Sequence, residues 1–138
     1  MVYCGEFEFV ESDGQVAALP CWTEGATEGA TLDDAVTMAA DWLRMAALDA
    51  LAVGERLDCG GFGHAPRMGG RIIAVAIEAD KRDIPSMSAA DAARALGVST
   101  ARVAQLCRSG KLDSWREGSC RMVSCESVED RLSETVSA

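Results

Sequence analysis

The segment from Ser88 to Leu106 restricts the fold of this chain most strongly, because its small, apolar and glycine residues have the spacing of a helix-turn-helix. A small residue, Ala93, stands where a second helix would cross the first. Gly97 comes four residues later and can adopt the positive φ of a tight turn without a Cβ clash. The apolar residues predicted to point inward from both helices are Ala92, Leu96, Val98, Val103 and Leu106.

The second helix of this pattern is predicted to present a polar side to solvent. Ser99 is its expected N-cap and a further candidate for DNA contact, because a helix with such a side fits the major groove. Arginine can form two hydrogen bonds to guanine, and glutamine can form two to adenine. The candidates for base contacts are therefore Thr100, Arg102 and Gln105. The basic residues expected to hold phosphates are Arg108, Lys111, Arg116 and Arg121. Sequence-specific DNA binding is therefore the first hypothesis.

The residues on either side of this helical corner predict a winged helix-turn-helix. Ser88 and Asp91 have the spacing of a capping box for the first helix. Two short strands, Leu112 to Arg116 and Arg121 to Ser124, flank a glycine-containing turn and form a hairpin. Ser124 is also the expected cap of a last helix. The residues of that helix expected to pack back onto the corner are Val128 and Leu132.

The net charge of −9 at pH 7 is distributed unevenly along the chain. Residues 1–83 contain six basic and fifteen acidic residues, whereas residues 84–138 contain seven of each. Within residues 99–124 five basic residues face two acidic ones, so the segment expected to contact DNA has a local charge of +3. An acidic N-terminal part would repel DNA but attract a basic protein, and the asymmetry therefore indicates a protein partner as well.

Residues 2–10 alternate as a strand does, with Tyr3, Phe7 and Phe9 on one side. Glu6 and Glu8 fall on the other side, which is expected to be exposed. An Asp-Gly turn at residues 12–15 then leads into a second strand, Val16 to Leu19. A third short strand is expected within residues 21–28.

A long helix is predicted from the N-cap Thr31 to about Val53, where Gly54 ends it. Its apolar stripe at helical spacing consists of Leu32, Val36, Ala39, Leu43, Ala47 and Ala50. Three further residues widen this stripe beyond what one sheet face would cover: Met38, Trp42 and Met45. These three are either ordinary core or a surface for a partner or a second copy, where Met and Trp are enriched.

Residues 59–70 contain five glycines and are expected to form a flexible loop. The nearly continuous apolar run from Arg71 to Ala79 predicts a buried strand, which gives the order strand, strand, strand, helix, strand. The charged segment from Asp80 to Pro85 is the expected linker. The sequence thus predicts an α+β protein with a two-layer domain at residues 1–80 and a winged helix-turn-helix domain at residues 86–138.

The sequence gives little support for a metal site, a cofactor or catalysis. The six cysteines are scattered without a CxxC pair, and free thiols are expected. Cys59 with His64, or Cys120 with Cys125, would supply only half of a zinc site. A ribonuclease-H-type nuclease would need converging carboxylates, but each candidate has a structural reason to exist. Those candidates are Glu6, Glu8, Asp13 and Asp33.

No apolar run approaches the ~20 residues that a membrane-spanning helix requires. The first residues lack the basic start and apolar stretch of a signal peptide. We therefore expect a cytoplasmic protein that does not contact a membrane.

The run AADAARALGVSTARVAQLCRSGKL, followed by a basic hairpin and SVEDRL, resembles the excisionase or MerR-type winged helix-turn-helix family over residues 86–133. Residues 1–80 resemble the HicB-type antitoxin family through the aromatic first strand, VESDGQVAALP and ATEGATLDDAVTMAADWL. The family pattern falls on Thr27, Glu28, Gly29, Thr31, Leu32, Asp33, Asp34 and Ala35.

The second resemblance implies a partial ribonuclease-H-like fold of order βββαβ. It also implies an antitoxin that neutralises a HicA-like toxin, a small basic protein that cleaves messenger RNA, and that represses its own operon by binding operator DNA. The alternative is a HicB-like transcriptional regulator without a toxin partner, and a third class is a protein-interaction module that never contacts DNA. A homodimer or higher homo-oligomer is expected, because operators are usually repeated half-sites.

Overall fold

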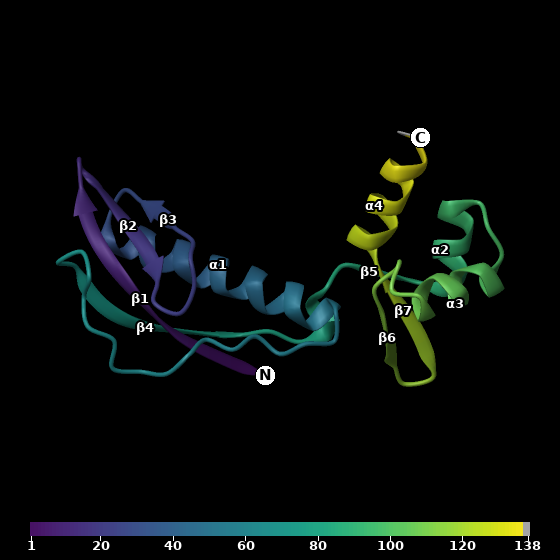
Figure 1. Cartoon of the computed structure of the whole chain (residues 1–138), viewed down its shortest axis with the longest axis horizontal. Coiled ribbons are helices and arrows are strands. Elements are labelled where there is room, and N and C mark those ends of the chain that lie inside the picture. Colours follow the sequence, from purple (N-terminus) through teal and green to yellow (C-terminus); the bar gives the residue numbers. More distant parts are fainter. Residues whose placement is uncertain (137–138) are drawn as a thin grey trace. The chain divides into compact units, whose positions relative to one another are not determined.

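The computed structural model describes residues 1–136 and divides the chain into two compact units. One unit comprises residues 1–50 and 56–80, and the other comprises residues 51–55 and the chain from residue 81 onward. They are called the N-terminal and the C-terminal unit below (Figure 1). Among residues 1–136, no helix combines the length and the apolar character that crossing a membrane requires.

The N-terminal unit contains a four-stranded antiparallel sheet of order β3-β2-β1-β4. Its strands are β1 (Val2–Ser12), β2 (Gln15–Pro20), β3 (Thr27–Gly29) and β4 (Arg71–Glu78). The predicted hairpin turn joins β1 to β2, and Asp13 (φ 53°) and Gly14 (φ 77°) both have positive φ, as a tight two-residue turn requires. The predicted order strand, strand, strand, helix, strand is present.

Helix α1 (Leu32–Ala52) packs its apolar stripe on one face of this sheet. Thr31 caps it, because the hydroxyl accepts the backbone N–H of Asp34 (3.2 Å). The buried stripe repeats every four residues, so Ala35 is buried while Leu32, Val36 and Ala50, which were predicted to be inside, are only half-buried. The residues of the stripe in this unit are Ala35, Ala39, Leu43 and Ala47.

Three aromatic rings connect the sheet to α1, and one of them belongs to the segment that precedes the third strand. Trp22 lies edge-on to Phe7, with ring centroids 5.2 Å apart, and Trp42 of α1 lies 6.0 Å from both rings. The chain bends at residues 21–24, and β3 forms at residues 27–29, at the end of the predicted stretch 21–28 and one residue beyond it. Trp22 therefore contributes its ring to the aromatic packing from a segment that is not a strand.

The prediction that Glu6 and Glu8 lie on an exposed strand face is wrong. Both are buried, because the glycine-rich loop at residues 59–70 folds over this face and donates its backbone N–H groups to them. Glu8 accepts hydrogen bonds from Arg67 (2.9 Å), Met68 (2.8 Å) and Gly70 (2.9 Å). A Cβ at Gly70 would lie 2.4 Å from the carbonyl oxygen of Phe9, so only glycine allows this approach.

Glu6 holds the same loop at a second point. Its Oε1 accepts the backbone N–H of His64 (3.1 Å) and lies 2.7 Å from Nδ1 of the same residue. The backbone N–H of His64 lowers the pKa of Glu6, as that of Arg67 lowers the pKa of Glu8. The two carboxylates of β1 therefore stabilise the loop in their ionised form.

We expect Glu8→Gln to release this loop, because an amide offers one accepting oxygen where the carboxylate offers two. Since the folded-state pKa of Glu8 is lowered, its contribution to stability is complete above the ordinary value of 4.5 and is lost as pH falls through the lowered value. Hydrogen-exchange protection of the Met68 and Gly70 amides should thus fall in the variant at pH 7 and in the unaltered protein on acidification.

Glu11→Gln is the matched control, because Glu11 belongs to the same strand but is exposed. Equal protection of the Met68 and Gly70 amides in Glu8→Gln and in Glu11→Gln would contradict this role of Glu8.

Within the C-terminal unit, residues 86–136 form three short helices and a three-stranded sheet of order β5-β7-β6. Its helices are α2 (Ala89–Leu96), α3 (Thr100–Arg108) and α4 (Cys125–Val136), and its strands are β5 (Ser86–Ser88), β6 (Ser114–Glu117) and β7 (Cys120–Ser124). The predicted linker at residues 80–85 contains one turn of 3₁₀ helix, η1 (Lys81–Asp83). The last two residues of the predicted 86–138 domain, 137 and 138, lie outside the described residues.

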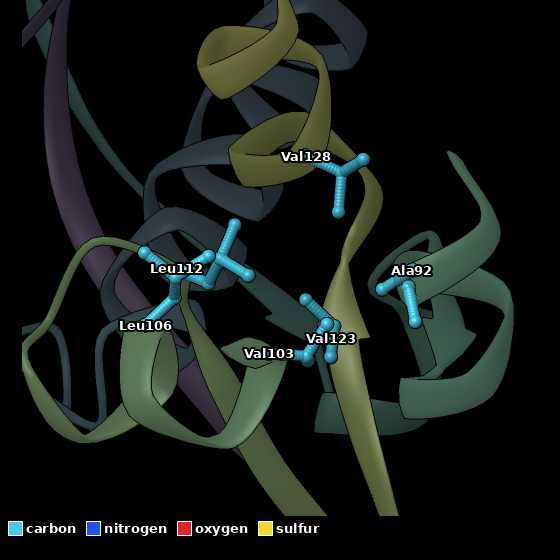
Figure 2. Packing of buried hydrophobic residues seen from close by; sticks show 7 residues of the cluster. Ala92, Val103, Leu106, Leu112, Val123 and Val128 are labelled. Carbon is cyan, nitrogen blue, oxygen red and sulfur yellow. The ribbon is translucent and has the colours of Figure 1, made fainter. Parts of the chain in front are cut away.

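One hydrophobic cluster joins the elements of this unit, and Figure 2 shows its side chains converging from α2, α3, β7 and α4. Val103 and Leu106 of α3 are buried in it, as predicted. The prediction for α4 is half right, since Val128 is buried and Leu132 is 37% exposed. The cluster consists of Ala92, Ala93, Val103, Leu106, Leu112, Val123 and Val128.

Candidate nucleic-acid interface

Local hydrogen bonds fix the corner between α2 and α3. Ser88 accepts the backbone N–H of Asp91 (3.1 Å), and Ser99 accepts that of Arg102 (3.1 Å), so both predicted N-caps are present. Gly97 ends α2 in the left-handed conformation (φ 67°), as predicted. Val98, predicted to be inside, is 38% exposed, because its place in the turn directs the side chain away from the cluster.

The outward side of α3 consists of exposed polar residues that do not take part in the core. Arg102 donates from Nη1 to Oε1 of Gln105 (3.2 Å), so the two predicted base-reading side chains form one hydrogen-bonded pair. This pair leaves further guanidinium N–H groups and the Gln105 amide N–H groups for a ligand. The exposed residues on this side are Thr100, Arg102, Gln105 and Arg108, and the capping residue Ser99 is also exposed.

The hairpin of β6 and β7 places two arginines directly opposite each other. Arg116 and Arg121 are partners in the strand register, and like charges in this position destabilise a strand pair. Arg121 is half-buried and donates from Nη1 to Ser114 Oγ (2.9 Å), whereas Arg116 is exposed. A phosphate beside the two guanidinium groups would remove their repulsion, which fits their predicted role.

Ser114 positions one of the predicted phosphate-binding arginines, and the sequence alone did not indicate this role. Its hydroxyl orients Arg121 from the neighbouring strand, and the signal would have been the register of the hairpin rather than any local motif. Lys111, another predicted phosphate-binding residue, is exposed just after α3. Of the exposed residues predicted to hold phosphates, Arg108 thus lies on α3, Lys111 just after it and Arg116 on the hairpin.

Three acidic residues of this unit, Asp91, Asp113 and Glu117, lie beside specific partners or in partly buried positions. The Arg94 guanidinium beside Asp91 lowers the pKa of that carboxyl. Burial, with the charge of Asp130, raises the pKa of Asp113. Glu117 accepts a hydrogen bond from Nε1 of the buried Trp115 (3.3 Å).

The three residues predicted as a partner surface line one shallow groove in the N-terminal unit. Met38 is 42% exposed and Met45 is 59% exposed. The ring of Trp42 packs against the other two rings of the aromatic cluster described above. Asp41 and Asp49 flank these three residues, and the groove encloses about 390 Å³. The structure thus allows Trp42 to be either a core residue or part of a partner surface, and it places both methionines at the surface.

The candidate catalytic carboxylates do not converge. Glu6 and Glu8 are bonded to loop amides, Asp13 lies in the β1–β2 turn, and Asp33 lies in the first turn of α1. Among residues 1–136, no three His, Cys, Asp or Glu side chains gather as metal ligands would. The six cysteines are free, and burial raises the pKa of the Cys21 and Cys59 thiols.

Residues 86–135 match the model of a protein family described as a helix-turn-helix domain. This stretch runs from β5 to the last turn of α4 and includes every residue predicted to contact DNA, from Ser99 to Arg121. The C-terminal part of the chain is therefore a helix-turn-helix domain. No curated protein and no solved structure matches the chain.

Proposed function

We propose that this chain is a cytoplasmic repressor that reads operator DNA with α3 and holds the DNA backbone with the β6–β7 hairpin. The observation that supports it most is the Arg102–Gln105 pair, which is exposed and hydrogen-bonded on the outward side of the second helix of a helix-turn-helix domain. Arg102 then contacts guanine and Gln105 contacts adenine, while Arg108, Lys111, Arg116 and Arg121 contact phosphates.

The test is a fluorescence-anisotropy titration of the full chain with DNA from upstream of its own gene. A specific site should bind with a Kd of about 10⁻⁸ M or tighter at physiological salt, roughly a thousandfold tighter than random DNA of equal length. Binding should weaken steeply with salt, because bound phosphates release counterions. Failure to bind either DNA would refute the proposal, and equal affinity for both would refute sequence-specific reading.

We further propose that the N-terminal unit has a partial ribonuclease-H-like, HicB-type fold and neutralises a small, basic, messenger-RNA-cleaving toxin of the HicA type. The excess of acidic residues in positions 1–83 supports this, since it favours the approach of a basic protein. The groove of Met38, Trp42 and Met45 supports it too, because apolar side chains beside Asp41 and Asp49 suit a partner that is both apolar and basic. The chain itself has no catalytic role in this proposal.

Met38→Lys with Met45→Lys should abolish capture of the basic product of the neighbouring reading frame in a co-expression pull-down. Lysines there add charge repulsion and remove exposed apolar contacts, and central interface residues cost about 2 kcal/mol or more. Met68→Lys is the matched control, because Met68 is 65% exposed but lies outside this groove. Capture by the Met38/Met45 double variant equal to that by Met68→Lys would place the toxin elsewhere.

The alternative is a regulator that has a HicB-like N-terminal unit but no toxin partner. The exposed apolar edge of β4 favours it, because such an edge suits association between copies of a regulator. A chromosomal neighbourhood without a short basic reading frame would support this alternative, and a captured basic neighbour would refute it.

A further inference from the structure

Strand β4 forms an outer edge of the N-terminal sheet and pairs with β1 on one side only. Among residues 1–136, no strand pairs with its other side. All six residues between the terminal Arg71 and Glu78 are apolar, and none is proline. Proteins usually protect an edge of this kind with charges, proline or a very short strand. Strand β4 itself has only its two end charges, and Arg44 of α1 donates from Nη1 to the carbonyl oxygen of Glu78 (2.9 Å) at one end.

The glycine-rich loop does not cover this edge with hydrogen bonds. Its bonds to the sheet run to Glu6 and Glu8 of β1. On the same outer face, Ala74 and Ala76 of β4 stay exposed. The part of the edge from Ile72 to Ile77 is therefore available to another strand.

The charges of β4 favour a second copy in the antiparallel direction. The N-terminal unit is strongly acidic, so two copies repel each other over most surfaces, but β4 has one positive and one negative end. Antiparallel pairing keeps the two Arg71 ends apart and the two Glu78 ends apart, whereas parallel pairing would bring like charges together.

We propose that β4 pairs antiparallel with β4 of a second copy, centred on Val75, and joins two four-stranded sheets into one continuous sheet. A two-fold axis normal to the sheet pairs only residues that share a face, so Val75 opposes itself, Ile73 opposes Ile77 and Ala74 opposes Ala76. Ile73 and Ile77 pair with Phe7 and Tyr3 within the sheet, so their face is the one that α1 covers. The pairing thus extends the apolar core across the seam between copies. It goes beyond the proposed function, because it specifies the direction and the register in which two copies associate.

The test compares two double variants of the full chain by sedimentation and light scattering over a concentration series. Ala74→Lys with Ala76→Lys places lysine opposite lysine twice in the dimer, and should raise its dissociation constant by about 10- to 30-fold. Ala74→Lys with Ala76→Glu alters the same exposed positions but places lysine opposite glutamate, and should preserve the dimer. The unaltered chain should have twice the monomer mass of 14.5 kDa.

A monomeric unaltered chain would overturn the proposal, as would a Lys/Lys variant that dimerises as tightly as the unaltered chain. Dissociation of both variants would also overturn it, because the Val75-centred register makes the Lys/Glu variant complementary. Each variant should have the same circular-dichroism spectrum as the unaltered chain. A lower mass in solution then reflects dissociation of a folded protein and not unfolding.

Discussion

Replacing Arg102 by alanine is expected to lower affinity for the operator by about 5- to 150-fold, the equivalent of roughly 1–3 kcal/mol for a bidentate arginine–guanine contact. Affinity for random DNA should change little, so the variant loses discrimination more than binding. The structure strengthens this expectation, because Gln105 holds the Arg102 guanidinium in place before DNA arrives. The measurement is a parallel anisotropy titration on operator and random duplexes.

Two further arginine variants serve as controls for Arg102→Ala. Arg94→Ala removes an exposed arginine of α2 that pairs with Asp91, and should leave both affinities nearly unchanged. Arg116→Ala removes a phosphate contact, so it should weaken all sequences alike and reduce the salt slope by about 1. If Arg102→Ala lowered the affinities for operator and random DNA equally, Arg102 would contact the DNA backbone and not a base.

Val103→Ala is expected to destabilise the helix-turn-helix domain by about 2 kcal/mol or more, because it removes two methyl groups and leaves a cavity. Val103 is fully buried at the centre of the cluster that joins α2, α3, β7 and α4 (Figure 2). In a domain of this size that loss corresponds to a fall in Tm of roughly 10 °C.

The matched control is Val98→Ala, which makes the same chemical change in the turn of the same domain. Because Val98 is 38% exposed, this variant should lose no more than about 0.5 kcal/mol. Thermal unfolding followed by circular dichroism measures both. A fall in Tm as large for Val98→Ala as for Val103→Ala would contradict the packing described for the turn.

The helix-turn-helix corner could be predicted from the sequence because its determinants are local. Ser88 and Ser99 cap backbone groups three residues away, and Gly97 supplies a positive φ at one position. Strand β5 could not be predicted in the same way, because three residues form it only by pairing with β7, more than thirty positions along the chain. The outward direction of Val98 was missed because spacing alone does not say which way a turn residue points.

The burial of Glu6 and Glu8 shows what a period-two pattern does not contain. The alternation correctly places both on the face opposite Phe7, but a loop from sixty residues away covers that face. The signal that could have indicated it is the glycine-rich composition of residues 59–70, since such a loop has many backbone N–H groups that need acceptors.

The candidate DNA-contacting residues were found from residue type and helical spacing, and the structure adds how they are held. The Arg102–Gln105 bond spans three residues of one helix and follows from that spacing. The opposition of Arg116 and Arg121, and the bond from Arg121 to Ser114, depend on the register of the hairpin. Register is set by the turn and by core packing, so the sequence pattern alone does not specify it.

The central claim is that α3 and the β6–β7 hairpin form the surface that contacts DNA. Amide chemical-shift mapping during titration with operator DNA tests it most directly. With operator DNA the account predicts shifts concentrated at residues 99–108 and 116–121, with little change in β1 or α1. With random DNA it predicts shifts in the hairpin but not in α3. Shifts centred on the N-terminal unit, with α3 unaffected by the operator, would contradict it.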